Sequence, residues 1–113
     1  MYVLGMIMEL WKKPVLVEVV RYNWVNYQGS LYVYYALSSR ALVPLLEQLY
    51  REGVREVYVT AVIKRRRVTM LMTVARKNGT YVLRGRGREV HRLLDEVYSS
   101  GNRVVVVEEV FAT

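Results

Sequence analysis

The chain has 113 residues, no cysteine, one histidine and a formal net charge of +7. Without cysteine, a disulfide framework and thiolate zinc sites are excluded, and an apolar content of 53% argues against a disordered chain. This length suits one domain with its own core, so we expect a single domain over residues 1–113.

The N-terminal run 1–8 is apolar, but Glu9 and a Trp-Lys-Lys-Pro sequence follow it where a signal peptide would have small residues. No stretch approaches the ~20 apolar residues that span a bilayer. We therefore expect a cytoplasmic protein with no membrane partner. Abundant valine and arginine and scarce glutamine indicate a thermophilic source.

The first expected element lies in residues 1–13, where a helix with Leu4 and Trp11 on one face and a short strand over residues 2–8 both fit. Pro14 ends either element. This N-terminal element could pack on the core of the domain or form a subunit interface, and the sequence leaves both hypotheses open.

Residues 15–37 are rich in β-branched and aromatic side chains, which predicts a long β-hairpin with its turn at Gln28-Gly29. Ser38-Ser39 then offers an N-cap for a helix that runs to about Glu52. Residues 54–63 are predicted to be a strand.

The second half repeats this order of elements. Strands are expected over residues 68–76 and 80–84, a helix over 88–100 and a final strand over 102–110. The run of four valines in the last strand is typical of a strand that is covered on both faces.

An offset of 48 residues relates the two halves, with eight identities in the twenty positions from residue 40. The identical pairs are Arg40/Arg88, Leu45/Leu93, Leu46/Leu94, Tyr50/Tyr98, Gly53/Gly101, Arg55/Arg103, Val57/Val105 and Val59/Val107. The pattern predicts a ββαβ unit used twice, over residues 15–63 and 64–110, after an N-terminal segment 1–13. We expect an α+β fold with a twisted, mainly antiparallel sheet and both helices on one face, or alternatively a ferredoxin-like arrangement.

The basic residues are concentrated in residues 64–92. This stretch contains Lys64, Arg65, Arg66, Arg67, Arg76, Lys77, Arg84, Arg86, Arg88 and Arg92, which are ten of the seventeen lysines and arginines of the chain. Its one acid is Glu89, so the positive field is local and indicates an anionic partner.

Within it, the sequence Arg-Gly-Arg-Gly-Arg (residues 84–88) joins a predicted strand to the second helix. Glycines allow close backbone approach to a ligand, and a helix N-terminus favours an anion. Guanidinium groups bind phosphates in a bidentate manner. The equivalent residues 36–40 keep one arginine, so the scaffold does not require this charge.

The aromatic residues are ten tyrosines and two tryptophans against one phenylalanine, a bias toward rings with a polar atom. Tyr22, Trp24, Tyr27, Tyr32, Tyr34 and Tyr35 lie in the first hairpin, and Tyr81 is the counterpart of Tyr32 in the second repeat. Aromatic rings on a sheet beside arginines form the platform on which single strands stack their bases. Tyr50 and Tyr98 recur at the helix ends, and we expect both to be structural.

Catalytic patterns are weak. His91 and Asp95 are four residues apart on a predicted helix but form only half of a metal site, so we expect no metal and no cofactor. Glu108 and Glu109 point to opposite faces of a strand. We expect a protein that is not an enzyme, with a metal-independent RNase of toxin type, using arginine, tyrosine and His91, as an alternative.

A short, cysteine-free, thermophile-like α+β chain that combines basic and aromatic residues resembles the ThermoDBP-related archaeal single-stranded DNA-binding proteins. The resemblance covers the chain as a type and transfers no residue by position. It implies sequence-tolerant binding of single strands by an oligomer, in grooves or tunnels between subunits.

We therefore predict largely sequence-independent binding of single-stranded nucleic acid by a homo-oligomer (a dimer or tetramer), with DNA favoured over RNA and both left open. The predicted site comprises Lys64, Arg65, Arg66, Arg67, Arg76, Lys77, Arg84, Arg86, Arg88, Tyr22, Trp24, Tyr27, Tyr32, Tyr34 and Tyr81. Besides the RNase, the other alternative is an assembly or adaptor domain of viral type whose aromatic rings form a protein interface.

Overall fold

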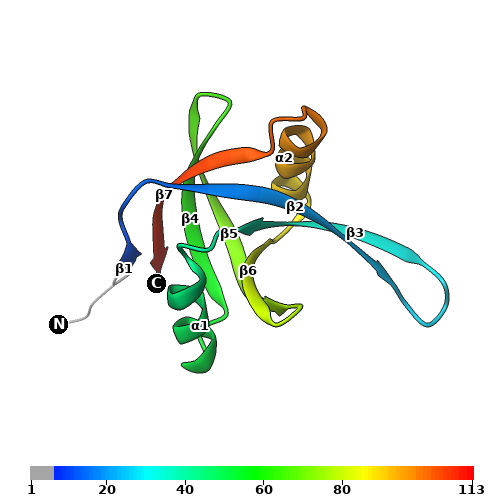
Figure 1. The fold of residues 1–113 in the computed structure, drawn as a ribbon, viewed down its shortest axis with the longest axis horizontal. Coiled ribbons are helices and arrows are strands. Elements are labelled where there is room, and N and C mark those ends of the chain that lie inside the picture. The colour runs from blue at the N-terminus through cyan, green and yellow to red at the C-terminus, as the bar shows by residue number, and fades with distance from the viewer. Residues whose placement is uncertain (1–6) are drawn as a thin grey trace.

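A computed structural model describes residues 7–113 and shows a closed antiparallel β-barrel with two helices (Figure 1). The elements are β1 (Met8–Trp11), β2 (Val15–Val25), β3 (Leu31–Ser38), α1 (Val43–Arg51), β4 (Glu56–Ile63), β5 (Arg66–Lys77), β6 (Thr80–Gly85), α2 (Arg88–Ser99) and β7 (Val104–Ala112). The part of the predicted N-terminal element in residues 1–6 lies outside the described residues. Met8–Trp11, the rest of that element, is a strand.

The barrel closes through β7. The strand order is β7-β2-β3-β6-β5-β4, and β4 returns to pair with β7. Residues 104–107 of β7 pair with β2, whereas residues 106–111 pair with β4 on the other side. β1 pairs with residues 110–112 of β7, on the same side as β2, and Pro14 lies between β1 and β2 in the chain. The prediction of an α+β fold, in which a ββαβ repeat forms one twisted sheet, was therefore wrong, because the sheet closes into a barrel.

The chain does run strand–strand–helix–strand twice, as β2-β3-α1-β4 and β5-β6-α2-β7. The strands of each unit do not form a separate half of the sheet. They interlock, since β4 pairs with β5 and β7 pairs with β2. Sequence periodicity locates strands but does not identify their partners, and here the ring closes because β7 pairs with both β2 and β4.

The helices also differ from the prediction, because they do not share one face. Figure 1 shows α1 and α2 at opposite ends of the barrel, where α1 packs on β5 and β6 and α2 on β2 and β3. Their buried residues, Leu46 and Leu49 in α1 and Leu94 and Val97 in α2, join the alternate inward residues of the strands in one core. Each helix covers one end of that core.

The hairpin of β2 and β3 extends beyond the barrel as an arm, which we define as residues 20–35. β2 pairs with β7 only through residues 15–18, and β3 pairs with β6 only at Ala36 and Leu37. Beyond these points the two strands pair with each other alone, and Figure 1 shows them projecting from the barrel. The side-chain oxygen of Asn26 accepts the backbone N–H groups of Gln28 and Ser30, both at 2.9 Å, and closes the tip.

Neither described helix, of nine and twelve residues, is long and apolar enough to cross a membrane.

The barrel core predicts a clear stability contrast between two strand leucines. Leu83 is fully buried, whereas Leu16 is 67% exposed on the outer wall. We expect Leu83→Ala to lower the free energy of unfolding by about 2–5 kcal/mol, because it removes buried methyl groups and leaves a cavity. Leu16→Ala is the matched control, with an expected change within about 0.5 kcal/mol. Urea unfolding measures both, and equal losses would contradict this core.

Candidate nucleic-acid interface

One face of the arm carries four aromatic rings. The register of β2 and β3 places Tyr22 opposite Tyr34 and Trp24 opposite Tyr32. The ring centroids of Tyr22 and Tyr34 are 5.3 Å apart and those of Trp24 and Tyr32 are 5.2 Å apart. Trp24 and Tyr32 remain 55% and 49% exposed. The rings form a ladder with free surface, and all four belong to the predicted site.

Two cations from the neighbouring hairpin lie against this ladder. The guanidinium carbon of Arg84, on β6, is 4.0 Å from the ring centroid of Tyr34. The ammonium of Lys77, at the end of β5, is 5.1 Å from the ring centroid of Tyr22. Both distances fit cation–π contacts. The structure thus brings six of the predicted site residues into one cluster, which we call the aromatic–basic cluster: Tyr22, Trp24, Tyr32, Tyr34, Lys77 and Arg84.

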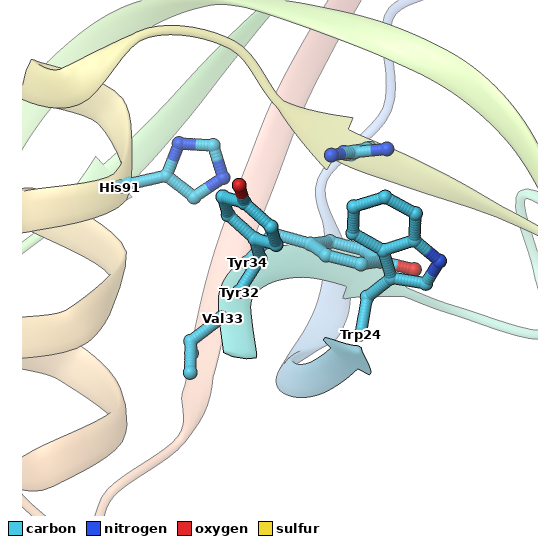
Figure 2. A pocket seen from close by; sticks show the side chains of 6 residues that line it. Trp24, Tyr32, Val33, Tyr34 and His91 are labelled. Atoms are coloured by element: carbon cyan, nitrogen blue, oxygen red, sulfur yellow. The ribbon is translucent and has the colours of Figure 1, made fainter. Parts of the chain in front are cut away.

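A cleft of about 430 Å³ opens between the arm and the start of α2. Its lining consists of Trp24, Tyr32, Val33, Tyr34, Arg84 and His91. Figure 2 shows the indole and phenol rings rising from the two strands of the arm, with the His91 ring reaching from the helix toward them. The size and the mixture of apolar walls with a few polar groups are those of a small-ligand pocket.

His91 lines the cleft but was not among the predicted binding residues, because the sequence assigned it only to the alternative of an RNase. Its Nδ1 lies 2.8 Å from the carbonyl oxygen of Gly87. Since a carbonyl oxygen only accepts, Nδ1 carries a proton, and in the neutral ring Nε2 is left as an acceptor. Nε2 is buried and has no hydrogen-bond partner in the described chain. The signal in the sequence was that His91 replaces Val43 of the first repeat.

The loop from Arg84 to Arg88 is only partly arranged as predicted. Gly85 is buried, and a Cβ there would lie 3.0 Å from Val90 Cγ1, so this glycine allows α2 to pack closely rather than a ligand to approach. Gly87 has a φ of 85° and begins α2 without a side-chain cap. Arg86 is paired with Glu56 of β4. Arg88 is exposed and makes no ion pair within residues 7–113.

The basic turn, residues 64–67, lies apart from the aromatic–basic cluster. Lys64 pairs with Glu96 near the C-terminal end of α2, and Arg67 pairs with Glu108 of β7, both at 2.9 Å. Lys64 and Arg65 form the two-residue loop of the β4–β5 hairpin with φ values of 51° and 64°. Arg65 and Arg66 are both exposed, and neither pairs with an acid in the part of the chain that the structure describes.

The remaining predicted residues occupy separate places. Tyr27 is at the tip of the arm and 94% exposed. Tyr81 is half-buried with its ring 5.4 Å from Tyr50, so it belongs to the edge of the core with that structural tyrosine. Arg76 is exposed on β5 opposite Tyr81.

Tyr35 anchors the root of the arm to α2. Its hydroxyl donates to Asp95, and its ring is 5.7 Å from that of Tyr98. Arg21 lies 5.1 Å from the Tyr98 ring centroid on the same side. Burial, and next the hydrogen bond to Asp95, raise the pKa of the Tyr35 hydroxyl. Tyr98 is therefore structural, as expected.

No group of three or more His, Cys, Asp or Glu side chains suited to a metal occurs in residues 7–113. Comparison of the chain with models of protein families, with curated proteins and with solved structures finds no match.

The anchor at Tyr35 predicts a pH dependence of stability. The raised pKa means that the folded state holds the hydroxyl proton more tightly than the unfolded state, whose pKa is about 10.0. This contribution is therefore present below pH 10 and is lost as the pH rises through the folded-state pKa. Tyr35→Phe should be less stable at neutral pH by about 0.5–1.5 kcal/mol but lose stability less steeply at high pH.

Urea unfolding at a series of pH values from neutral upward measures this difference. Asp95→Asn is a useful comparison, because it keeps an acceptor for the hydroxyl while removing the negative charge. Its slope should fall between those of the wild type and Tyr35→Phe. Identical slopes for all three proteins would contradict the assignment.

Proposed function

We propose that the protein binds single-stranded nucleic acid at the arm, with DNA as the strand that the resemblance to ThermoDBP-related proteins favours. The observation that carries the proposal is the aromatic–basic cluster, in which Arg84 and Lys77 lie against four rings on one face. Exposed rings that stack bases, next to cations that hold phosphates, are the two components of sequence-tolerant single-strand binding.

The ring surfaces favour unpaired bases. In a duplex the faces of the bases are stacked on each other, so a protein ring gains access only where bases are splayed apart. Trp24 and Tyr32 both border the cleft and remain half-exposed. A base that enters the cleft would contact these rings, while the guanidinium of Arg84 stays within reach of its phosphate.

The charge distribution supports the same arrangement. Residues 22–39 contain no charged side chain, and Arg21, the one charge of the arm, lies against the Tyr98 ring, so the outer part of the arm offers stacking surface without holding phosphates itself. The phosphates would be held by Lys77 and Arg84 beside the rings and by Arg88 at the start of α2. The acid partners of Lys64, Arg67 and Arg86 partly neutralise those three cations.

Loss of a stacking ring should weaken binding strongly. Trp24→Ala and Tyr32→Ala each remove a ring worth about 1–3 kcal/mol per stacked base, which corresponds to a 5- to 150-fold higher Kd. Tyr58→Ala is the matched control, since this half-buried ring stacks on Phe111 at 5.4 Å on another wall of the barrel. The measurement is a fluorescence titration with labelled single-stranded DNA, RNA and duplex at two salt concentrations.

In the same titration, the logarithm of the wild-type affinity should fall with the logarithm of salt by about 0.7 per neutralised phosphate. Duplex should bind more weakly than either single strand. Equal affinity of the wild type and both ring variants would sink the proposal.

The basic turn is tested separately. Replacing Arg65, Arg66 and Arg67 by alanine should weaken binding to every sequence alike and reduce the salt slope, because such contacts read no base. Arg51→Ala serves as a charge control on α1, where Arg51 pairs with Glu47 at 2.7 Å. Unchanged affinity of the triple variant would confine the site to the arm.

The unpartnered Nε2 of His91 keeps an RNase as a second candidate. His91 lines the cleft, and an imidazole nitrogen that acts as an acceptor can serve as a general base. Incubation of labelled RNA with the wild type and His91→Ala separates the two functions. We expect intact RNA with both proteins, and cleavage that requires His91 would overturn the binding-only proposal.

A further inference from the structure

The arm has a free strand edge on β2. The backbone N–H of Val19 donates to Arg103 at 2.7 Å, away from β3, and the N–H of Asn26 donates to Ser30 at 3.0 Å, toward β3. Because antiparallel residues alternate in direction, the odd residues of β2 direct their N–H and C=O groups outward. Arg21, Asn23 and Val25 therefore present backbone groups with no partner strand in the described chain, since β2 pairs with β7 only through residues 15–18.

This edge has little of the usual protection against pairing, since Arg21 at its root is its one charged residue. Edge strands are normally shielded by charges, prolines or bulges. The chain is 24% charged, yet residues 22–39 have no charged side chain and no proline. An isolated two-stranded ribbon is also marginal in water, and Val25 and Leu31 are exposed side by side on it.

We propose that the β2 edge of the arm pairs with the β2 edge of a second copy of this chain, in an antiparallel two-fold dimer centred on Asn23. Two copies that each carry +7 repel one another over most of their surfaces, and residues 22–35 of the arm, which carry no charge, are where they can approach. An identical antiparallel strand is self-complementary about a two-fold axis.

The register follows from the two-fold axis. With Asn23 opposite Asn23 of the partner subunit, Arg21 lies opposite Val25 of the partner subunit, so the two Arg21 side chains are not opposed. The outward backbone groups of residues 21, 23 and 25 then meet in hydrogen-bonded pairs. The result is a four-stranded sheet, β3-β2-β2-β3, that spans both subunits.

This dimer would unite the aromatic faces. Even residues of β2 share one face, so Tyr22 comes opposite Trp24 of the partner subunit. The rings of the two arms would then lie on one face of the four-stranded sheet, in two rows that cross the interface. This part of the inference rests on the proposed function, because it makes one stacking platform that serves both subunits.

Proline scanning of the two edges tests the dimer. Asn23→Pro removes an outward N–H without breaking the β2–β3 ladder, because proline is tolerated on an edge strand. Leu31→Pro is the matched control, since Leu31 lies opposite Val25 and directs its N–H outward from β3. We expect a mass twice the 13.3 kDa of one chain for the wild type and Leu31→Pro, and a single-chain mass for Asn23→Pro, by light scattering without nucleic acid.

A second variant avoids any dependence on proline. Asn23→Lys places like charges opposite each other on the two-fold axis, which should raise the dimer Kd by about 2- to 5-fold in low salt and less in high salt. A monomeric wild type, a dimer that survives Asn23→Pro, or equal dissociation by Leu31→Pro would each overturn the β2-edge dimer.

The shared platform has its own test. If rings of both subunits bind one strand, folded Asn23→Pro should lose affinity for a long oligonucleotide more than for a short one. A dimer whose dissociation leaves long-strand affinity unchanged would overturn the platform and leave the dimer standing. A dimer without any nucleic-acid affinity would instead contradict the proposed function and the shared platform, and leave the β2-edge dimer standing.

Discussion

The pairing of β7 with strands on both its sides is the constraint on which the structure depends. Its first residues bond to β2 and its later ones to β4, so one strand joins the two ends of the sheet into a ring. Closure gives the interior a single core and leaves the two ends for α1 and α2 to cover. It also limits how far β2 is covered, because β7 begins at Val104 and the strand beyond Glu18 must continue without it.

The arm is thus a consequence of barrel closure as much as of its own sequence. The barrel holds the root of the arm, where Tyr35 bonds to Asp95 and packs on Tyr98. Beyond the root, Lys77 and Arg84 from the adjacent hairpin reach the aromatic face. A barrel with a projecting ribbon suits a partner whose bases stack in a row. Tyr22, Trp24, Tyr32 and Tyr34 of the arm are not part of the buried core, so the proposed binding surface and the stability of the core depend on different residues.

Sequence reasoning located the elements because their signals are local: the second helix, expected over residues 88–100, is Arg88–Ser99. It missed closure because the valine run of β7 looked like a strand covered on both faces, whereas Val105 and Val107 are buried and Val104 is exposed. Clustering of aromatic residues in the first hairpin was visible, since neighbours across a hairpin are set by its turn. The acid partners of Arg86 and Lys64 could not be predicted, because Glu56 and Glu96 are distant in sequence and the folded barrel brings them close.

The β4–β5 turn shows a conflict between backbone and charge. Two-residue hairpin loops with positive φ at both positions favour Asn-Gly, because side chains there are strained. This loop holds Lys64 and Arg65 instead, at a conformational cost of about 1–2 kcal/mol each. The fold therefore carries two cations at a corner where a neutral pair would be more stable. Thermostability and cationic character are opposed at this turn, so engineering the barrel for stability here would remove charge from its surface.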